Sequence, residues 1–268
     1  MRRRTFLAAA AASTGVGAFT RDGTAPGRRA LANAPTVPRP APVPVAAGLE
    51  ILPRDAWGAD LPAGPTRAET PRFLLVHHTA SPNDSRDARD VLRGGYAFQT
   101  GPAKGWPDVC YQFFIARDGV VWEGRAGSLA GPVVADATGG SQGWAQLVCL
   151  IGDYSTIAPT EAAIDSLVLL LEWIARRDGI DVTDGAATTF ISRGSQRWAA
   201  GTTVTTPTIA AHRDMSYTVC PGDPVVAMLP EIRRRVALVH LRYTASVPST
   251  PHPNGLAPAR RLGRISSP

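Results

Sequence analysis

The sequence of 268 residues is poor in cysteine, in charge and in long apolar runs. Three cysteines are too few for a disulfide-dense scaffold. Charged residues make up only 19% and hydrophobic residues 44%, which excludes a chain that is mostly a disordered polyelectrolyte. No apolar run reaches the roughly 18 residues of a membrane-spanning helix. We therefore expect one domain or two small ones, with no stable membrane insertion.

The centre of the chain also lacks basic charge, although the formal net charge is +6. Residues 1–32 carry a net charge of +5 and residues 241–268 a net charge of +4, which leaves −3 for residues 33–240. A nucleic-acid-binding domain carries its basic patch on the fold itself. We therefore expect no nucleic-acid partner.

The first 32 residues have the layout of an export signal. Arg3 and Arg4 precede a short stretch of small and apolar residues between Phe6 and Phe19. A basic region before such a stretch is typical of a secretory signal, and the arginine pair resembles the twin-arginine type. We expect a twin-arginine-type signal at 1–32, cleavage after Ala32 and a secreted protein. The alternative is a frayed basic terminus.

Composition then divides the rest of the chain. Proline occupies alternate positions in much of 35–45, which favours an extended linker at 33–47. The segment 241–268 is basic and mostly poor in large apolar residues, which predicts a disordered tail. We expect one folded domain at 48–240.

Within 48–240, strand patterns come early and helical patterns flank them. Short apolar or β-rich runs predict strands at 73–76, 111–116, 120–123, 147–151 and 208–211, and Asp118-Gly119 predicts a hairpin. Helices are predicted at 85–98, at 160–178 between a Thr160 cap and Gly179, and from Asp223 onward. This arrangement indicates an α/β fold with a mixed central β-sheet flanked by helices.

Two histidines and one cysteine stand near the ends of predicted strands. His77 follows the run 73–76, His212 follows the run 208–211, and Cys220 comes shortly after. Two neutral imidazoles and a thiolate suit Zn²⁺, and three protein ligands leave a fourth position for water. Spacing alone equally allows ordinary polar residues at strand ends, so both interpretations stay open at this point.

Ordered motifs add a resemblance to a known family. They are ILPRDAWGA at 51–59, HHTA at 77–80, GWPDVCYQF at 105–113, DGVVWEGR at 118–125, GDY at 152–154, HRD at 212–214 and CPGD at 220–223. Over about 50–230 the chain resembles the peptidoglycan recognition proteins and the related zinc N-acetylmuramoyl-L-alanine amidases (type 2 amidases). The segment 190–220 resembles their secreted actinobacterial branch. The resemblance implies the same α/β domain, peptidoglycan as partner and a location at the cell wall; we expect a monomer.

The resemblance also assigns the candidate metal ligands. It implies that His77, His212 and Cys220 bind Zn²⁺, whereas His78 is usually not a ligand. Non-catalytic relatives typically lack the cysteine ligand. The presence of Cys220 therefore favours an enzyme.

Two further positions match residues that assist catalysis in the family, namely Tyr111 and Thr218. The scissile bond is the amide between N-acetylmuramic acid and the first L-alanine of the stem peptide. Zinc lowers the pKa of water toward about 7 and polarises the carbonyl. The two hydroxyls can donate to the developing oxyanion, and losing one such donor costs on the order of 10²–10³ in rate. The alternatives are a core aromatic for Tyr111 and an ordinary loop hydroxyl for Thr218.

The sequence departs from the family pattern in the segment 135–142. The usual histidine, aromatic residue and asparagine become Ala137, Ser141 and Gln142. In the family these positions border the substrate groove. The change bears on two expectations: the specificity for glycan and stem peptide, and the turnover of substrate.

Cysteine is the other departure. Cys110 replaces a glycine before Tyr111, and Leu147 replaces a strand glycine two residues before Cys149. With Cys220 on zinc, Cys110 and Cys149 are left over on predicted strands of one sheet. An exported protein can join them in a disulfide, and the alternative is a pair of buried thiols.

The leading prediction is thus a secreted zinc-dependent amidase that cleaves peptidoglycan between glycan and stem peptide. Two other hypotheses remain. One is a non-catalytic module that binds or senses peptidoglycan, and the other is a zinc hydrolase of another acylated amide. The complete zinc set favours the first, and the altered 135–142 segment favours the others.

Overall fold

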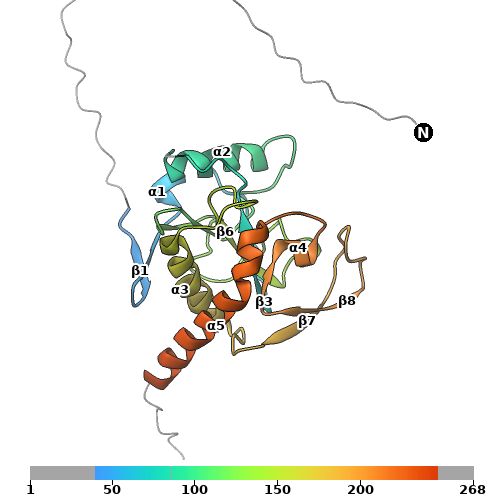
Figure 1. Ribbon diagram of the computed structural model, residues 1–268. Helices are drawn as coiled ribbons and strands as arrows, with labels where there is room; N and C mark the ends of the chain where they lie inside the picture. Colours follow the sequence, from blue (N-terminus) through green and yellow to red (C-terminus); the bar gives the residue numbers. More distant parts are fainter. Residues whose placement is uncertain (1–39, 85, 247–268) are drawn as a thin grey trace, which may run out of the picture. The chain divides into compact units, whose positions relative to one another are not determined.

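A seven-stranded sheet forms the centre of the fold, in the order β1-β2-β5-β4-β6-β3-β9. The computed structural model describes residues 40–84 and 86–246 (Figure 1). The strands are β1 (Val43–Ala46), β2 (Leu49–Leu52), β3 (Phe73–His78), β4 (Phe113–Ile115), β5 (Val121–Glu123), β6 (Ala145–Leu150) and β9 (Ile209–Ala211). β3 is parallel to β6 and β9, whereas β1–β2 and β4–β5 are antiparallel pairs. The predicted α/β fold with a mixed sheet is confirmed.

Helices cover both faces of this sheet. They are α1 (Asp55–Gly58), α2 (Ala88–Thr100), α3 (Glu161–Asp178), α4 (His212–Met215) and α5 (Asp223–Ser246). Side chains of α3 and α5 pack on one face, together with every second residue of β3 and β6. α1 and α2 pack on the other face, against β4, β5 and the end of β6.

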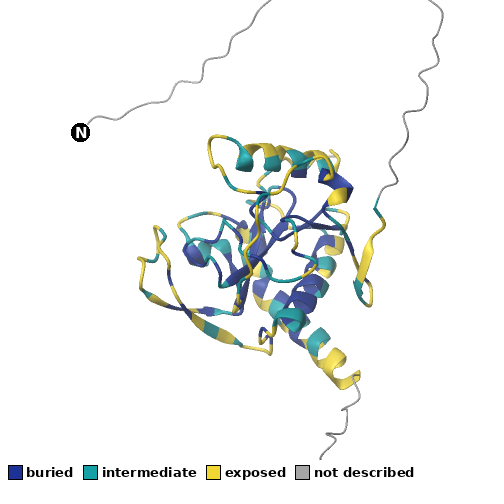
Figure 2. Ribbon diagram, turned by 180° about the vertical axis from the view of Figure 1, so that it is seen from behind, coloured by how far each residue is buried: buried dark blue, intermediate teal, exposed yellow. Residues whose placement is uncertain are grey.

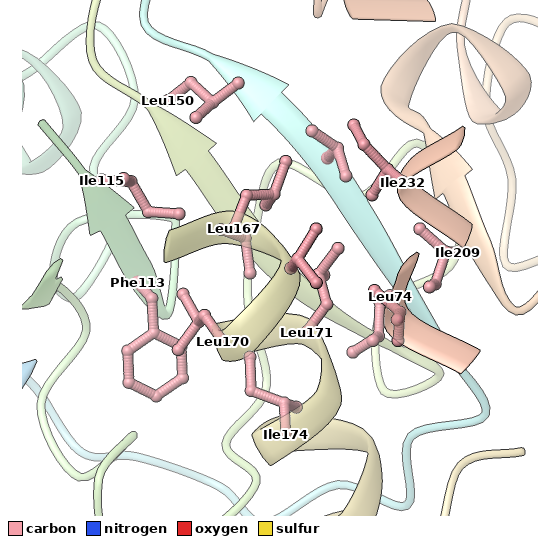
Figure 3. Packing of buried hydrophobic residues seen from close by; sticks show 14 of the residues in the cluster. Leu74, Phe113, Ile115, Leu150, Leu167, Leu170, Leu171, Ile174, Ile209 and Ile232 are labelled. Carbon is pink, nitrogen blue, oxygen red and sulfur yellow. The ribbon is translucent and has the colours of Figure 1, made fainter. Parts of the chain in front are cut away.

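The face under α3 is the apolar core of the molecule. Thr160 caps α3 by accepting a hydrogen bond from the backbone N of Ala163 at 3.2 Å, and Gly179 ends the helix at φ +70°, as predicted. The side chains of α3 point onto the strands (Figure 3), with Leu167, Leu170, Leu171 and Ile174 against Leu74, Phe113, Ile115 and Leu150. Burial of each large side chain contributes about 1.5–3 kcal/mol.

The central strand β3 is buried along its whole length. Both of its faces are covered, which explains the uninterrupted apolar run in the sequence. Successive side chains point to opposite faces. Leu74, Val76 and His78 therefore face α3 and α5, whereas Phe73, Leu75 and His77 face the opposite side.

The predicted hairpin joins β4 and β5. Gly119 has φ +87°, and a Cβ there would lie 2.8 Å from the carbonyl oxygen of Ala162 in α3. Asp118 Oδ1 accepts a hydrogen bond from the backbone N of Val120 at 3.1 Å. The turn therefore needs both residues of the Asp-Gly pair.

A second hairpin, β7 (Ala187–Ile191) with β8 (Thr203–Pro207), was not predicted from the sequence. It forms a separate two-stranded sheet. Its inner side chains, Phe190 and Val204, pack on the His77 face of β3, and the rings of Phe73 and Phe190 lie 5.1 Å apart. The strands are rich in threonine and an eleven-residue segment separates them, so no short hairpin signal marks them.

Some boundaries differ from those expected. β1 lies inside the range predicted as linker and pairs with β2 at the edge of the sheet, where Pro44 is tolerated. α2 begins at Ala88, and α5 continues past residue 240 to Ser246; Figure 2 shows exposed residues at the end of α5. The predicted signal at 1–32 lies outside the described residues. None of the described helices combines the length and apolar character needed to cross a membrane.

Candidate metal centre

The candidate site lies where β3 ends. Strand alternation points His77 to the face opposite α3 and α5. His77 is fully buried there. β9 runs parallel to β3, so its end brings His212, the first residue of α4, to the same edge of the sheet.

Cys220 is folded back onto this edge by backbone hydrogen bonds. The backbone N of Arg213 donates to the carbonyl oxygen of Cys220 at 3.1 Å, and the backbone N of His78 donates to Cys220 Sγ at 3.4 Å. The short helix and the cysteine loop are therefore tied to each other and to the end of β3.

The structure brings together the three residues predicted as ligands. One nitrogen of His77, one of His212 and Sγ of Cys220 all lie within 4.8 Å of one another. Cys220 Sγ lies 3.8 Å from His77 Nδ1, and the two imidazole centroids are 4.3 Å apart. This compactness suits three donors converging on one small ion.

The protonation of the imidazoles also fits metal binding. Burial, aided by the neighbouring histidines, lowers the pKa of His77 well below its ordinary value and that of His212 to about 4. Both rings are therefore neutral near pH 7, the form that binds metal. Among the described residues, the buried Nε2 of His77 has no hydrogen-bond partner.

Cys220 needs a cation to become a ligand. Burial raises the pKa of its thiol to about 12. A bound metal ion deprotonates a coordinating thiol, so metal binding at this site releases a proton. The donor set of two nitrogens and one sulfur is one that zinc prefers. The residues present therefore fit zinc.

His78 has a different role from its neighbour. Its Nδ1 accepts a hydrogen bond from the backbone N of Tyr154 at 3.1 Å, and Asp153 lies 3.9 Å from the same atom. It does not belong to the group of converging donors. His78 thus fixes the loop after β6, in keeping with the expectation that it is not a ligand.

Tyr111 lies beside the donor group, just before β4. Its ring centroid is 5.0 Å from that of His77. The segment is held by Arg125, whose backbone N donates to the carbonyl oxygen of Tyr111 at 2.9 Å and whose Nε donates to that of Val109 at 2.9 Å. Burial raises the pKa of Tyr111 well above its ordinary value, so the phenol keeps its proton.

Thr218 lies on the loop that carries Cys220. Its Oγ1 accepts a hydrogen bond from the backbone N of Cys220 at 3.2 Å, which leaves its own proton available. Thr218 lines a surface cavity of about 470 Å³, between the exposed side chains of Tyr217 and Val219. This residue therefore shapes the ligand loop and borders open space.

The altered segment 135–142 lies next to the candidate site. Ala137 packs against the same cluster as Tyr111 and Met215. Gly139 has φ +57°, and a Cβ there would lie 2.2 Å from Oγ of Ser216. Ser141 is buried and donates to the carbonyl oxygen of Thr138 at 2.6 Å. The segment thus reaches α4 and the cysteine loop, where it offers no imidazole.

The three cysteines are all free and buried. The disulfide between Cys110 and Cys149 is therefore absent, and the alternative of two buried thiols holds. Both thiols lie close to Tyr111, which sequence reasoning missed because it considered them only as partners of each other. The signal was present, since Cys110 directly precedes Tyr111.

Fold and side-chain cluster together define a class: an α/β protein with a three-donor, zinc-site-like group at the carboxyl ends of its central strands. The sequence model of the N-acetylmuramoyl-L-alanine amidase family matches residues 67–223. The chain belongs to this family, whose relatives include the peptidoglycan recognition proteins.

Individual relatives differ in how much of them is matched. The chain is 31% identical over 187 residues to the N-acetylmuramoyl-L-alanine amidase of Sus scrofa. The aligned region covers 67% of this chain but only 26% of that protein. It is 25% identical over 220 residues to peptidoglycan-recognition protein LB of Drosophila melanogaster, covering 78% and 82%. The crystal structure of Drosophila peptidoglycan recognition protein SD superposes with a TM-score of 0.51 at 21% identity, covering 67% and 92%. This last likeness shows the fold alone.

Proposed function

We propose that this protein is a zinc-dependent N-acetylmuramoyl-L-alanine amidase, which hydrolyses the amide between N-acetylmuramic acid and L-alanine in peptidoglycan. The observation that carries the proposal is the convergence of His77, His212 and Cys220 within 4.8 Å, with Nε2 of His77 buried and unpartnered among the described residues. The family match over 67–223 supports peptidoglycan as the substrate class.

The three donors would hold the metal, and the chain's other groups would serve the reaction. When bound, zinc supplies Lewis-acid chemistry, which polarises a carbonyl and activates water near neutral pH. His77 and His212 enter as neutral ligands, and His78 fixes the neighbouring loop.

Tyr111 and Thr218 are proposed to stabilise the oxyanion. Each carries a hydroxyl proton beside the donor group, and Tyr111 keeps its proton because burial raises its pKa. Hydrogen-bond donors aimed at developing charge are typically the largest single contribution to such catalysis. Cys220 as an anionic ligand reduces the charge of the metal site, which makes these donors more important.

One observation favours a second candidate, a non-catalytic peptidoglycan-binding or sensing module. The segment 135–142 reaches the site with Ala137 where the family resemblance expects histidine. The same departure leaves room for a zinc hydrolase of another acylated amide. Intact donors favour the amidase over both.

The test is direct. Purified protein, loaded with one equivalent of zinc, is incubated with defined muropeptides and the products are identified by mass spectrometry. Free stem peptide, lost after chelation and restored by zinc, is expected. Zinc binding and muropeptide binding with no release of stem peptide would establish the binding module, and cleavage of a different amide alone would establish the third hypothesis.

We also propose that the protein is exported to the cell wall by the twin-arginine-type signal at 1–32 and acts as a monomer. Replacing Arg3 and Arg4 by lysine should leave the protein inside the cell. Normal secretion of that variant would rule the route out. Light scattering of the purified protein should give the mass of one chain.

A further inference from the structure

The connection between β7 and β8 has no part in the mechanism proposed above. It spans residues 192–202. Trp198 within it packs on the cluster of side chains that contains Met215, the last residue of α4. The connection therefore lies against the helical turn that begins with His212, one of the three proposed metal ligands.

Three side chains of this connection donate hydrogen bonds to the end of α4. The carbonyl groups in the last turn of a helix have no donor within the helix. Trp198 Nε1 donates to the carbonyl oxygen of Asp214 at 2.8 Å, and Ser195 Oγ donates to the next carbonyl oxygen along the chain at 2.9 Å. Arg197 Nη1 donates to the carbonyl oxygen that precedes that of Asp214. Three consecutive carbonyl groups of α4 thus receive their hydrogen bonds from one segment.

The three donors are themselves held in one tight turn. Ser195 Oγ accepts hydrogen bonds from the backbone N of Arg197 at 3.2 Å and of Trp198 at 3.0 Å. The backbone N of Ser195 donates to the carbonyl oxygen of Trp198 at 2.8 Å, and Ser192 Oγ donates to the same carbonyl oxygen at 3.0 Å. The turn 195–198 is therefore fixed both within itself and to the residue that follows β7.

α4 transmits this support to two of the proposed ligands. Asp214 Oδ2 accepts a hydrogen bond from the backbone N of Ala211 at 2.9 Å, so the turn that begins with His212 is held at both of its ends. The backbone N of Arg213 donates to the carbonyl oxygen of Cys220 at 3.1 Å, which ties the cysteine loop to the same turn. A displacement of α4 would therefore displace His212 and Cys220 together.

We propose that Ser195, Arg197 and Trp198 are positioning residues for the metal centre, which hold α4 so that His212 meets the other two donors. Ligands that are already in place bind more tightly, because less ordering remains to be done on binding. Groups that orient metal ligands without touching the metal typically contribute about 10- to 100-fold to its affinity. The proposal rests on the zinc site of the proposed function, but not on turnover.

The first experiment removes one donor and keeps an aromatic ring in its place. Trp198→Phe loses the indole N–H and should weaken zinc binding about tenfold, measured on the purified full chain by competition with a chelator. Arg197→Ala, at an exposed position, should weaken it in the same direction. Unchanged affinity in both variants would overturn the proposal.

Trp144→Phe is the matched control. Trp144 packs on the same cluster as Trp198, and its Nε1 also donates to a backbone carbonyl oxygen, that of Ile191 at 3.2 Å. This carbonyl group belongs to β7 and not to α4. Trp144→Phe should therefore keep the wild-type affinity for zinc. A loss equal to that of Trp198→Phe would mean that any weakening of the hairpin has this effect, and the proposal would fail.

Two further measurements separate positioning from a general loss of stability. In the zinc-free protein, the backbone amides of 212–216 should exchange with deuterium faster in Trp198→Phe than in the wild type, and zinc should restore slow exchange. The visible bands of the cobalt-loaded protein depend on the geometry of the donors and should change in the same variant. A lower Tm with unchanged exchange and unchanged bands would show that the connection only stabilises the fold.

The outcomes also distinguish this inference from the proposed function. If the wild type binds zinc and Trp198→Phe binds it equally well, the inference fails while the amidase proposal stands. If the wild type binds zinc but releases no stem peptide, the amidase proposal fails, and a tenfold loss of affinity in Trp198→Phe still supports the inference. If the wild type binds no zinc, both fail.

Discussion

His77 and His78 are neighbours in sequence, yet they belong to different regions of the molecule. His78 points to the face that α3 and α5 cover, where its Nδ1 accepts a backbone hydrogen bond. His77 points to the opposite face, where its Nε2 is buried without a partner among the described residues. One imidazole therefore has a hydrogen-bond partner within the chain, whereas the other has a buried ring nitrogen that lacks one among the described residues.

The difference follows from what each face contains. The α3 face is mostly apolar, and the imidazole of His78 has a hydrogen-bond partner there. The His77 face brings two imidazoles and the thiol of Cys220 within 4.8 Å of one another, with the ring of Tyr111 beside them. A buried polar group without a partner costs about 1–3 kcal/mol. Such a cost is tolerated where a ligand makes the missing contact, and at His77 the unpartnered nitrogen lies in a ring that converges with two other metal-binding side chains.

The largest contrast is expected between variants that replace His77 or another proposed ligand and a variant that replaces His78. His77→Ala, His212→Ala or Cys220→Ser should abolish tight zinc binding and turnover, because two donors remain where three are needed. His78→Asn keeps an acceptor near the position of Nδ1 and should retain about one zinc ion. Metal content measured by atomic emission on folded protein decides this. Full retention of zinc by the first three variants would refute the ligand assignment.

A purely structural change belongs to the other face. Leu171 of α3 is fully buried in the apolar cluster. Leu171→Ala should lower the free energy of unfolding by about 2–5 kcal/mol, since it removes buried methyl groups and leaves a cavity. Denaturant unfolding measures the loss. Zinc content and kcat of the folded fraction should stay at wild-type values, and a parallel loss of zinc would mean that the two faces are not independent.

The hydroxyl donors should affect only the reaction. Tyr111→Phe and Thr218→Val are each expected to reduce kcat by about 10²-fold, because each removes a donor to the oxyanion. Zinc content, fold and muropeptide affinity should change little, since the donors act when charge develops. Steady-state kinetics with calorimetric binding separate the two quantities. If both variants keep the wild-type kcat, the hydroxyls are structural.

The α3 face was the more predictable of the two from sequence. The cap at Thr160, the terminator Gly179 and the apolar periodicity between them are local signals, and local geometry decides helix limits. The Asp118-Gly119 turn is predictable for the same reason. The β7–β8 hairpin was not, because a long separating segment and threonine-rich strands leave no local mark.

The site was predictable in part, and largely through family resemblance. Motif matches identified His77, His212 and Cys220, but only the fold brings residues from two strand ends and a loop within 4.8 Å. The packing of Tyr111 against the cluster that contains Cys149 depends on strand register across β3, β4 and β6. Register is a property of tertiary pairing, which no single segment of the sequence encodes.

One acid on the α3 face sharpens the comparison further. Gln146 is the register partner of Leu74 and donates to Glu69 Oε1. Among the described residues, the buried Oε2 of Glu69 has no hydrogen-bond partner. Burial raises the pKa of Glu69 from 4.5 to about 8, and the nearby Asp178 adds to the effect.

This shift predicts a pH dependence of stability rather than of chemistry. The folded protein holds a proton on Glu69 that the unfolded chain has released, so the free energy of unfolding falls as pH rises from 4.5 to about 8. Glu69→Gln removes the titration and should raise Tm by a few degrees at pH 8, with little change near pH 5. Thermal unfolding at both pH values measures this, with Glu50→Gln on the exposed side of β2 as the matched control. An equal Tm difference at both pH values would show that Glu69 is ionised in the folded protein and that this end of the face carries a charge after all.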